Sequence, residues 1–359
     1  MSISKLVILL SNFVIFSLTC LEISLEKKIG QMILVGFKGT DEKETSAIIE
    51  NIKNYDIGGV ILLGRNVCNP HQLKMLINSL QNNADIPLFI AIDYEGGYVN
   101  RLSAEKGFSK TVSAKKMGEQ GAEYTYQCAK KMAQHLGALG INMNFAPVVD
   151  LHNEGNCIAN KERCFSKSFK QVVNCAGAFI KAHEEEGICC TLKHYPGHGS
   201  STTDSHHDFT DVTRTWKEEE LIPYTYFIDK GEAKCIMASH VCLRSLDDTF
   251  PASMSFNMIT KLLRETLGFK GVVITDDIQM DALYKNYSLN EIVINAINAG
   301  VDILLINNNN YKYEENIVSK VFSIIKNAVE TDRISACTID EAYSRITSLK
   351  RSIIPHFID

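Results

Sequence analysis

The chain of 359 residues contains one tryptophan, and only 8% of its residues are aromatic. This scarcity argues against a ligand site built on stacked rings and favours recognition by hydrogen bonds. Basic residues are not in excess, since 37 Lys and Arg face 42 Asp and Glu, a net charge of −5. That balance excludes the basic surface typical of nucleic-acid-binding proteins.

Two local motifs are also missing from the sequence. No Cys-x-x-Cys pair occurs, which excludes a zinc ribbon and a thioredoxin-like redox site. No Gly-x-Gly-x-x-Gly turn follows the first apolar run, which argues against an open doubly wound sheet that binds a dinucleotide.

The N-terminal residues have the pattern of a targeting segment. Lys5 precedes a nearly continuous apolar run over 6–18, which is shorter than the ~20 residues that a membrane-spanning helix needs. We therefore predict a signal peptide over 1–19 and export to the periplasm or the extracellular space. Cys20 raises the alternative of a lipid anchor, although Thr19 directly before it departs from the usual lipobox.

Cysteine is abundant, with eleven residues in the chain. Most of them lie within apolar strand or helix patterns, where a buried free thiol is the usual state. Export would permit disulfides. Cys157 and Cys164 flank a short polar loop and are the best candidates for one, and whether they pair stays open.

Eight short apolar runs alternate with longer amphipathic segments after residue 20. The runs are continuous or β-branched and do not alternate with polar residues, which is typical of parallel strands buried on both faces. Eight strands, each followed by a helix, predict a single (β/α)8 TIM barrel of the α/β class, forming one catalytic domain over 20–359. The predicted strands are 32–37, 58–63, 87–93, 141–150, 189–196, 233–241, 270–277 and 301–307.

The helices are predicted from apolar stripes between these runs. A closing helix over 338–353 is expected to begin at Thr338, with Glu341 completing a capping box. The other predicted helices are 41–55, 71–83, 113–139, 169–186, 217–230, 257–267, 288–299 and 316–331.

Polar residues end five of the predicted strands. In a TIM barrel the carboxyl ends of the strands meet at one face, where reactive residues gather. Burying such groups unpaired would cost several kcal/mol, so five of them at one face predict a shared polar pocket. These strand-end residues are Asp93, Asp150, Lys193 with His194, His240, and Asp276 with Asp277.

The loop after the fifth strand concentrates histidine and aspartate over 193–208. Asp204 and His206 are two residues apart, so the carboxylate can orient the imidazole as a proton-transfer pair. The alternatives are a solvated His-rich surface loop and a metal site.

Six segments, in order, resemble the bacterial β-N-acetylglucosaminidase branch of glycoside hydrolase family 3. KHYPGHGS…DSH (193–206) is similar to its KH(F/S)PGHG…DxH signature. The other five are DYEGGYVNRL (93–102), NFAPVVD (144–150), RCFS (163–166), ASHV…PASMS (238–255) and GVVITDDIQM (271–280).

The resemblance implies a retaining exo-hydrolase that removes terminal β-linked N-acetylglucosamine from glycans. It implies Asp276 as the nucleophile and His206, oriented by Asp204, as the general acid/base. Asp277 is expected to point away from the substrate, because side chains alternate along a strand. The residues implied to bind the sugar are Asp93, Arg101, Arg163, Lys193 and His194.

Peptidoglycan fragments and chitooligosaccharides both end in this sugar, and the chain is expected to act on them as a monomer without metal or other cofactor. Tyr98 departs from the family pattern, which has arginine there. Three other functions stay open: a phosphorylase that releases N-acetylglucosamine 1-phosphate, a metal-dependent hydrolase that uses the His-rich loop, and an inactive sugar-binding protein.

Overall fold

The computed structural model describes residues 23–153, 157–201, 210–309, 313–354 and 357. The predicted signal peptide, Cys20, and the Asp204–His206 pair lie outside these residues. In the described part of the chain, no helix combines the length and apolar composition needed to cross a bilayer.

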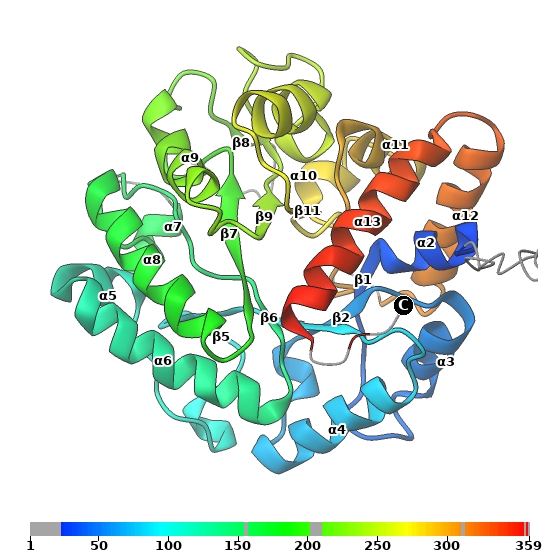
Figure 1. Cartoon of the computed structure of the whole chain (residues 1–359), viewed down its shortest axis with the longest axis horizontal. Helices are drawn as coiled ribbons and strands as arrows, with labels where there is room; N and C mark the ends of the chain where they lie inside the picture. The colour runs from blue at the N-terminus through cyan, green and yellow to red at the C-terminus, as the bar shows by residue number, and fades with distance from the viewer. Residues whose placement is uncertain (1–22, 154–156, 202–209, 310–312, 355–356, 358–359) are drawn as a thin grey trace, which may run out of the picture.

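Eight parallel strands form the centre of the molecule (Figure 1). Their order around the sheet is β11-β9-β7-β6-β3-β2-β1-β12. A parallel bridge between Ile274 and Ile303 joins the two outer strands, so the sheet is a nearly closed barrel. The strands are β1 (Ile33–Gly36), β2 (Gly59–Leu62), β3 (Phe89–Ile92), β6 (Met143–Asn144), β7 (Cys189–Tyr195), β9 (Cys235–Ala238), β11 (Val272–Thr275) and β12 (Leu304–Ile306).

Each of the eight predicted strands contains one barrel strand, and the predicted TIM barrel is confirmed. Every residue of these strands is buried, because the inner face packs into the barrel and the outer face packs against helices. Four short strands lie outside the barrel. They are β4 (Tyr94–Gly96) and β5 (Val99–Asn100), which form a hairpin, and β8 (Thr210–Asp211), which pairs with β10 (Val241–Cys242).

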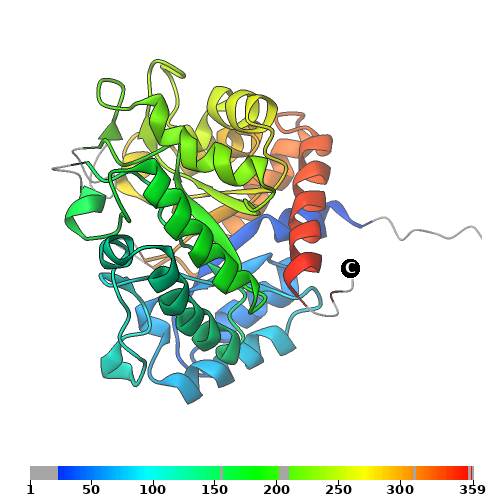
Figure 2. The ribbon, with the colours of Figure 1, turned by 60° about the vertical axis from the view of Figure 1, so that its left-hand side comes forward.

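Helices surround the barrel, and Figures 1 and 2 both show α6 and α8 side by side on its outside. The helices longer than one turn are α2 (Leu25–Gln31), α3 (Ser46–Tyr55), α4 (Pro70–Asn82), α5 (Ala114–Gln120), α6 (Ala122–Leu139), α8 (Phe169–Glu184), α9 (Ile222–Asp229), α11 (Leu289–Ala299), α12 (Ile317–Glu330) and α13 (Ala336–Ile353). The short turns are η2 (Gly64–Asn66), η3 (Ala104–Lys106), α7 (Cys157–Asn160), η4 (Glu218–Leu221), η5 (Ala252–Met254) and α10 (Asp281–Tyr284).

Several helix predictions were wrong in detail. The predicted helix 41–55 begins only at Ser46, and 217–230 is the turn η4 followed by α9. The segment 113–139 is two helices, because the backbone of Gly121 between them has φ 93°, which a helix cannot contain. The segment 257–266 is wound as a π-helix. The closing helix α13 begins earlier than predicted, since the Ser335 side chain, not Thr338, accepts the capping hydrogen bond, from the N–H of Cys337.

Candidate active site

A polar cavity of about 200 Å³ lies at the carboxyl ends of the barrel strands. It brings together six of the eight predicted site residues from strands and loops far apart in sequence. These six are Asp93, Arg101, Arg163, Lys193, His194 and Asp276.

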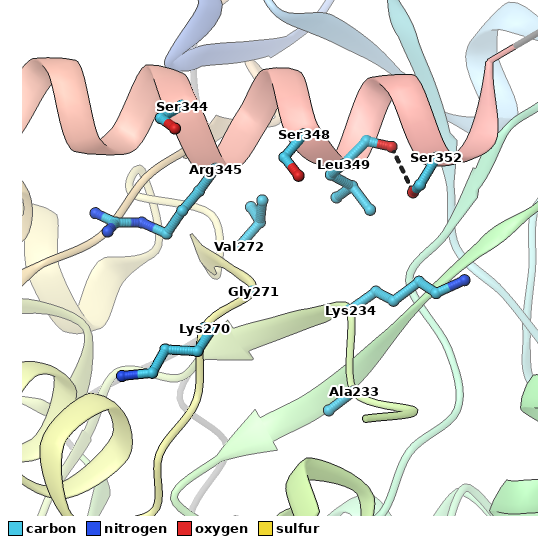
Figure 3. Close-up of a pocket in the computed structure, with 10 residues that line it drawn as sticks. All are labelled: Ala233, Lys234, Lys270, Gly271, Val272, Ser344, Arg345, Ser348, Leu349 and Ser352. Carbon is cyan, nitrogen blue, oxygen red and sulfur yellow. Dashed lines mark hydrogen bonds between the residues drawn. The ribbon is translucent and has the colours of Figure 1, made fainter. Parts of the chain in front are cut away.

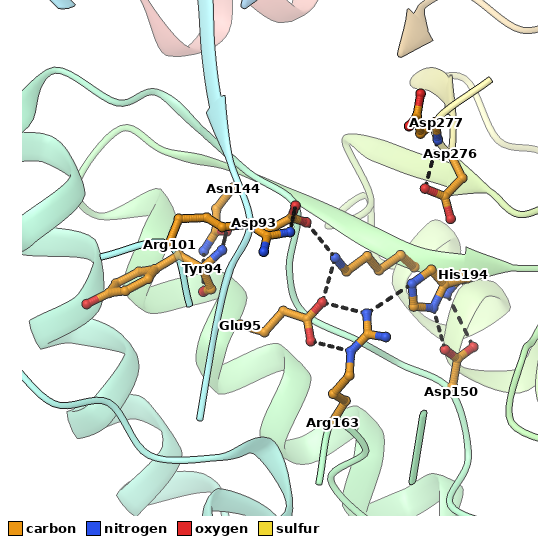
Figure 4. A network of polar contacts seen from close by, with 11 residues as sticks. Asp93, Tyr94, Glu95, Arg101, Asn144, Asp150, Arg163, His194, Asp276 and Asp277 are labelled. Carbon is orange, nitrogen blue, oxygen red and sulfur yellow. Dashed lines mark hydrogen bonds and ion pairs between the residues drawn. The ribbon is translucent and has the colours of Figure 1, made fainter. Parts of the chain in front are cut away.

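The floor of this cavity is a network of ion pairs (Figure 4). Lys193 Nζ lies 3.0 Å from Asp93 Oδ1 and 2.6 Å from Glu95 Oε1. Arg163 donates two hydrogen bonds to Glu95, of 2.8 and 2.7 Å. Arg101 donates to the other oxygen of Asp93, at 3.0 Å. Two carboxylates therefore compensate three cations within one buried cluster.

The network fixes the charge of its members. Burial alone would raise the pKa of Asp93, but the charges of Lys193 and Arg101 outweigh it and hold this pKa well below the usual range. Burial likewise opposes ionisation of Glu95, yet Arg163 and Lys193 lower its pKa. The carboxylates in turn raise the pKa of Lys193 against the effect of its own burial. All of these groups stay ionised near neutral pH.

His194 extends the network to a second carboxylate. Its Nδ1 lies 2.7 Å from Asp150 Oδ2, and its Nε2 lies 3.3 Å from an Arg163 nitrogen. Asp150 also accepts from the backbone N–H of His198 at 2.9 Å, which ties the start of the 197–201 loop to β6 and β7. The carboxylate thus orients the imidazole so that Nε2 faces Arg163 and the cavity.

Glu95 is a site residue that the sequence analysis did not select. It lies in β4, two residues after Asp93, and pairs with both Arg163 and Lys193. The predicted strand ends at Asp93, whereas the extended backbone continues into β4. Continuing the two-residue alternation would have placed Glu95 on the same side as Asp93 and Tyr94 on the other.

Two polar atoms at the cavity remain available for a ligand. Arg101 Nε and Asn307 Oδ1 are both buried and have no hydrogen-bond partner among the described residues. One is a donor and the other an acceptor, which suits the hydroxyl groups of a polyol. Asn307 follows β12 and was also not predicted, because asparagine at a strand end is common in ordinary turns.

Asp276 and Asp277 occupy different environments, as predicted. Asp276 follows β11, is partly exposed and lines the cavity. Its Oδ1 accepts a 2.8 Å hydrogen bond from the Asp277 backbone, which orients the carboxylate. Asp277 is buried, does not line this cavity, and accepts from the N–H groups of Gln279 and Asn307.

The expectation that all five polar strand ends line one pocket was wrong for two residues. Asp150 supports His194 from behind the cavity wall. His240 is fully buried, with Nδ1 2.8 Å from Ser253 Oγ and Nε2 2.9 Å from the Asp277 carbonyl oxygen. The contact with Asp277 braces the segment that carries Asp276, and the contact with Ser253 ties it to η5.

The mouth of the cavity carries the departure at Tyr98. This side chain is 71% exposed, and Lys161 Nζ lies 5.6 Å from the centre of its ring. Tyr98 replaces the arginine of the family pattern, but Lys161 still places a positive charge at the mouth. The candidate Cys157–Cys164 bridge stays open, because the Cys157 side chain lies outside what the structure describes.

A larger hollow of about 390 Å³ lies at the opposite end of the barrel, between α13 and the starts of β9 and β11 (Figure 3). Its lining includes the hydroxyls of Ser344, Ser348 and Ser352 but no carboxylate. Within the described ranges, no three His, Cys, Asp or Glu side chains are placed to hold a metal ion. A metal site that uses residues 202–209 lies outside those ranges.

Comparison with protein families and curated proteins gives a consistent result. The sequence model of the glycosyl hydrolase family 3 N-terminal domain matches residues 24–349. The chain is 33% identical to "Beta-hexosaminidase A" of Pseudoalteromonas piscicida over 85% of its own length and 55% of that protein. It is 37% identical to "Beta-hexosaminidase" of Tolumonas auensis over 72% of its own length and 78% of that protein.

Solved structures agree with these matches. A glycoside hydrolase family 3 β-N-acetylglucosaminidase from a Paenibacillus species superposes with a TM-score of 0.85 at 33% identity, covering 92% of this chain and 62% of that one. A β-N-acetylhexosaminidase from Beutenbergia cavernae gives a TM-score of 0.84 at 27% identity, covering 92% and 99%. The chain therefore spans little more than half the length of some relatives and nearly the whole of others.

Proposed function

The chain belongs to glycosyl hydrolase family 3, and on that premise we propose that it hydrolyses terminal β-linked N-acetylglucosamine at the non-reducing end of glycans. One observation carries the proposal: the Asp276 carboxylate, oriented by the Asp277 backbone N–H, faces a cavity whose floor is a fixed network of charged hydrogen-bonding groups. A cavity of about 200 Å³ matches one sugar ring, so cleavage is expected to release one sugar at a time.

The proposed reaction is a double displacement. The Asp276 carboxylate attacks the anomeric carbon and forms a glycosyl-enzyme bond while the leaving oxygen takes a proton from His206. His206 then removes a proton from water, which breaks the glycosyl-enzyme bond and restores the carboxylate. Asp204 is assigned to orient His206. The latter two assignments rest on the sequence motif, because both residues lie outside the described ranges.

The ion-pair network is proposed to bind the sugar. Asp93 is ionised and accepts hydrogen bonds from ring hydroxyls, whereas Arg101, Arg163 and Lys193 donate them. His194 offers Nε2 at the same face. Because each group is already held by a partner, the sugar meets fixed dipoles and little side-chain entropy is lost on binding.

The natural substrates proposed are peptidoglycan fragments or chitooligosaccharides, met after export to the periplasm or extracellular space. The activities named for the relatives support the sugar and the linkage, while the predicted signal peptide is the basis for export. We propose that the enzyme acts as a monomer and without a metal ion.

The test is release of p-nitrophenol from its β-N-acetylglucosaminide and from its β-glucoside. Wild type should prefer the first substrate, and Asp276→Ala should lower kcat by about four to six orders of magnitude. Asp340→Ala is the matched control, since this exposed carboxylate pairs with Lys28 on the outer surface. NMR of the first-formed product should show a β-anomer, as double displacement requires.

Three outcomes would overturn the proposal. N-acetylglucosamine 1-phosphate formed in phosphate buffer would make the chain a phosphorylase. Loss of activity on treatment with a chelator, with recovery on adding zinc, would establish the metal-dependent alternative. Sugar binding without turnover of either substrate by folded protein would establish a binding protein.

A further inference from the structure

A second cavity of about 310 Å³ lies behind the candidate active site, between α6 and the segment 109–112. Tyr94 connects the two. Its neighbours Asp93 and Glu95 face the sugar cavity, whereas the Tyr94 ring points away from them and lines the second cavity (Figure 4). We call this the rear pocket. It shares no lining residue with the sugar cavity.

The floor of the rear pocket contains polar atoms without partners. The Tyr94 side chain is 0% exposed, and its hydroxyl has no hydrogen-bond partner among the described residues. His135 Nδ1, on α6, is in the same state. Leaving a buried hydroxyl without a hydrogen-bond partner costs about 1 to 3 kcal/mol. The two unpartnered atoms therefore indicate that a bound ligand supplies the missing hydrogen bonds. Burial raises the pKa of Tyr94 to about 12, so the phenol keeps its proton as a donor.

The charge of the rear pocket has one sign. Lys110 and Lys131 lie at its exposed rim, and neither takes part in an ion pair within the described part of the chain. None of its described lining residues is acidic. An uncompensated pair of cations above a phenol donor favours an anionic group.

The remaining lining sets the size and the character of the ligand. Val112 and Met132 give an apolar wall, and Tyr124, which is 39% exposed, gives an aromatic face at the rim. Aromatic and aliphatic surfaces of this kind pack against the C–H face of a sugar ring. The volume admits about one such ring.

We propose that the rear pocket binds an organic anion of monosaccharide size, in which a carboxylate or phosphate is attached to a sugar ring. Lys110 and Lys131 hold the anionic group, Tyr94 donates to it or to a ring oxygen, and the apolar wall packs against the ring. Both a sugar acid and a sugar phosphate are anions of this kind, and the experiment distinguishes between them.

The test is isothermal titration calorimetry with glucuronate, glucose 6-phosphate and neutral glucose. At least one anion should bind wild type more tightly than glucose, with an affinity that falls as salt is added. The double variant Lys110→Gln/Lys131→Gln should weaken binding by about tenfold, as expected for two partly exposed ion pairs. Lys170→Gln is the matched control, because Lys170 is an exposed lysine outside both pockets.

Hydrolysis of the β-N-acetylglucosaminide should be unchanged in the double variant, which shows that its sugar cavity is intact. Tyr94→Phe gives a second signature. It should weaken anion binding, because the phenol donor is lost. It should also raise the Tm of the free protein, because it removes a buried hydroxyl that has no partner until the anion binds. If the hydroxyl served only the fold, Tm would fall instead.

The proposal is overturned if neither anion binds at millimolar concentration, or if the double variant binds as wild type does. A fall in Tm for Tyr94→Phe with unchanged anion affinity would also overturn it, because the hydroxyl would then serve the fold alone.

Discussion

The two ends of the barrel both bury charged side chains, but they use them differently. At the carboxyl end, Glu95, Arg163 and Lys193 pair with one another beside an open cavity. At the amino end, fully buried Asp302 pairs with Arg264 at 2.7 Å and Arg345 at 2.8 Å. Both ends satisfy their charges, so pairing alone does not distinguish a candidate active site from a structural cluster.

The difference lies in what else the charged groups bind. Asp302 accepts from the Val273 N–H at 2.7 Å, and Arg264 donates to the carbonyls of Gly300 and Gly271. These bonds tie the starts of β11 and β12 to the helices. The carboxyl-end network bonds mainly side chain to side chain and leaves Arg101 Nε and Asn307 Oδ1 unpaired at the cavity. Unused hydrogen-bonding capacity beside an open cavity, more than buried charge, distinguishes this network from the Asp302 cluster.

The largest effect is expected from breaking the carboxyl-end network. Glu95→Gln replaces a carboxylate that pairs with Arg163 and Lys193 by a neutral amide, so both cations lose compensation and shift. We expect kcat/KM to fall by about 10²- to 10³-fold, as when a fixed electrostatic group is removed from an active site. Glu186→Gln is the control, since it removes only an outer ion pair with Lys130. Activity within threefold of wild type would show that Glu95 does not position the site.

The matching change at the amino end should affect stability instead. Asp302→Asn removes the buried carboxylate that pairs with Arg264 and Arg345, leaves Arg345 only its 3.4 Å pair with Glu341, and should lower the free energy of unfolding by about 3 to 5 kcal/mol. Activity per folded molecule should remain near wild type. Urea unfolding measures the first quantity, with Asp340→Asn as the exposed-pair control, expected to cost at most about 1 kcal/mol. A loss of kcat in Asp302→Asn as large as that expected for Glu95→Gln would contradict the division between the two ends.

A smaller effect, dependent on pH, is expected at Glu220. Its Oε2 accepts from the Gly199 N–H at 3.0 Å, and burial raises its pKa to about 7 from 4.5. The folded state therefore binds more protons than the unfolded state between these values, so its contribution to stability is lost as pH rises from 4.5 to 7.

Glu220→Gln keeps the acceptor for Gly199 and cannot ionise. Its free energy of unfolding should match wild type near pH 4.5 and exceed it by roughly 3 kcal/mol above pH 7. Urea unfolding at pH 5 and pH 8 measures this difference. A constant difference at both pH values would mean that Glu220 does not titrate in this range.

Much of the barrel could be predicted because parallel strands buried on both faces have continuous apolar sequences. The ends of the helices were harder to predict. The break at Gly121 depends on a backbone angle, and the cap at Ser335 depends on one local hydrogen bond. The π-helical winding of 257–266 left no signal in the apolar spacing.

The site was predictable where its residues end strands, as at Asp93 and Asp276, because barrel geometry brings those ends together. Glu95 was missed because its partners Arg163 and Lys193 are distant in sequence, and Asn307 because asparagine at a strand end is common in ordinary turns. The pairing of Lys193 and Arg163 with Asp93 and Glu95, and not with Asp276, likewise follows from three-dimensional position alone.

The smallest effect is expected at Lys350, a buried lysine of the amino end that lies outside the Asp302 cluster. It is fully buried, donates to Gln31 Oε1 and to the Pro87 carbonyl at 2.6 Å, and has no carboxylate partner among the described residues. Burial lowers its pKa well below 10.5, so the unfolded state binds more protons and wild-type stability should rise with pH up to that value.

Lys350→Met removes this dependence. Relative to wild type, the variant should lose about 1 kcal/mol of stability per pH unit as pH rises toward 10, with unchanged activity. Parallel stability curves for the two proteins over this range would show that Lys350 remains charged in the folded state, held by its two acceptors and the ring of Phe89 5.0 Å away. The amino end would then stabilise a lone buried cation with neutral acceptors, whereas the carboxyl end needs carboxylates to hold Arg163 and Lys193 beside the cavity.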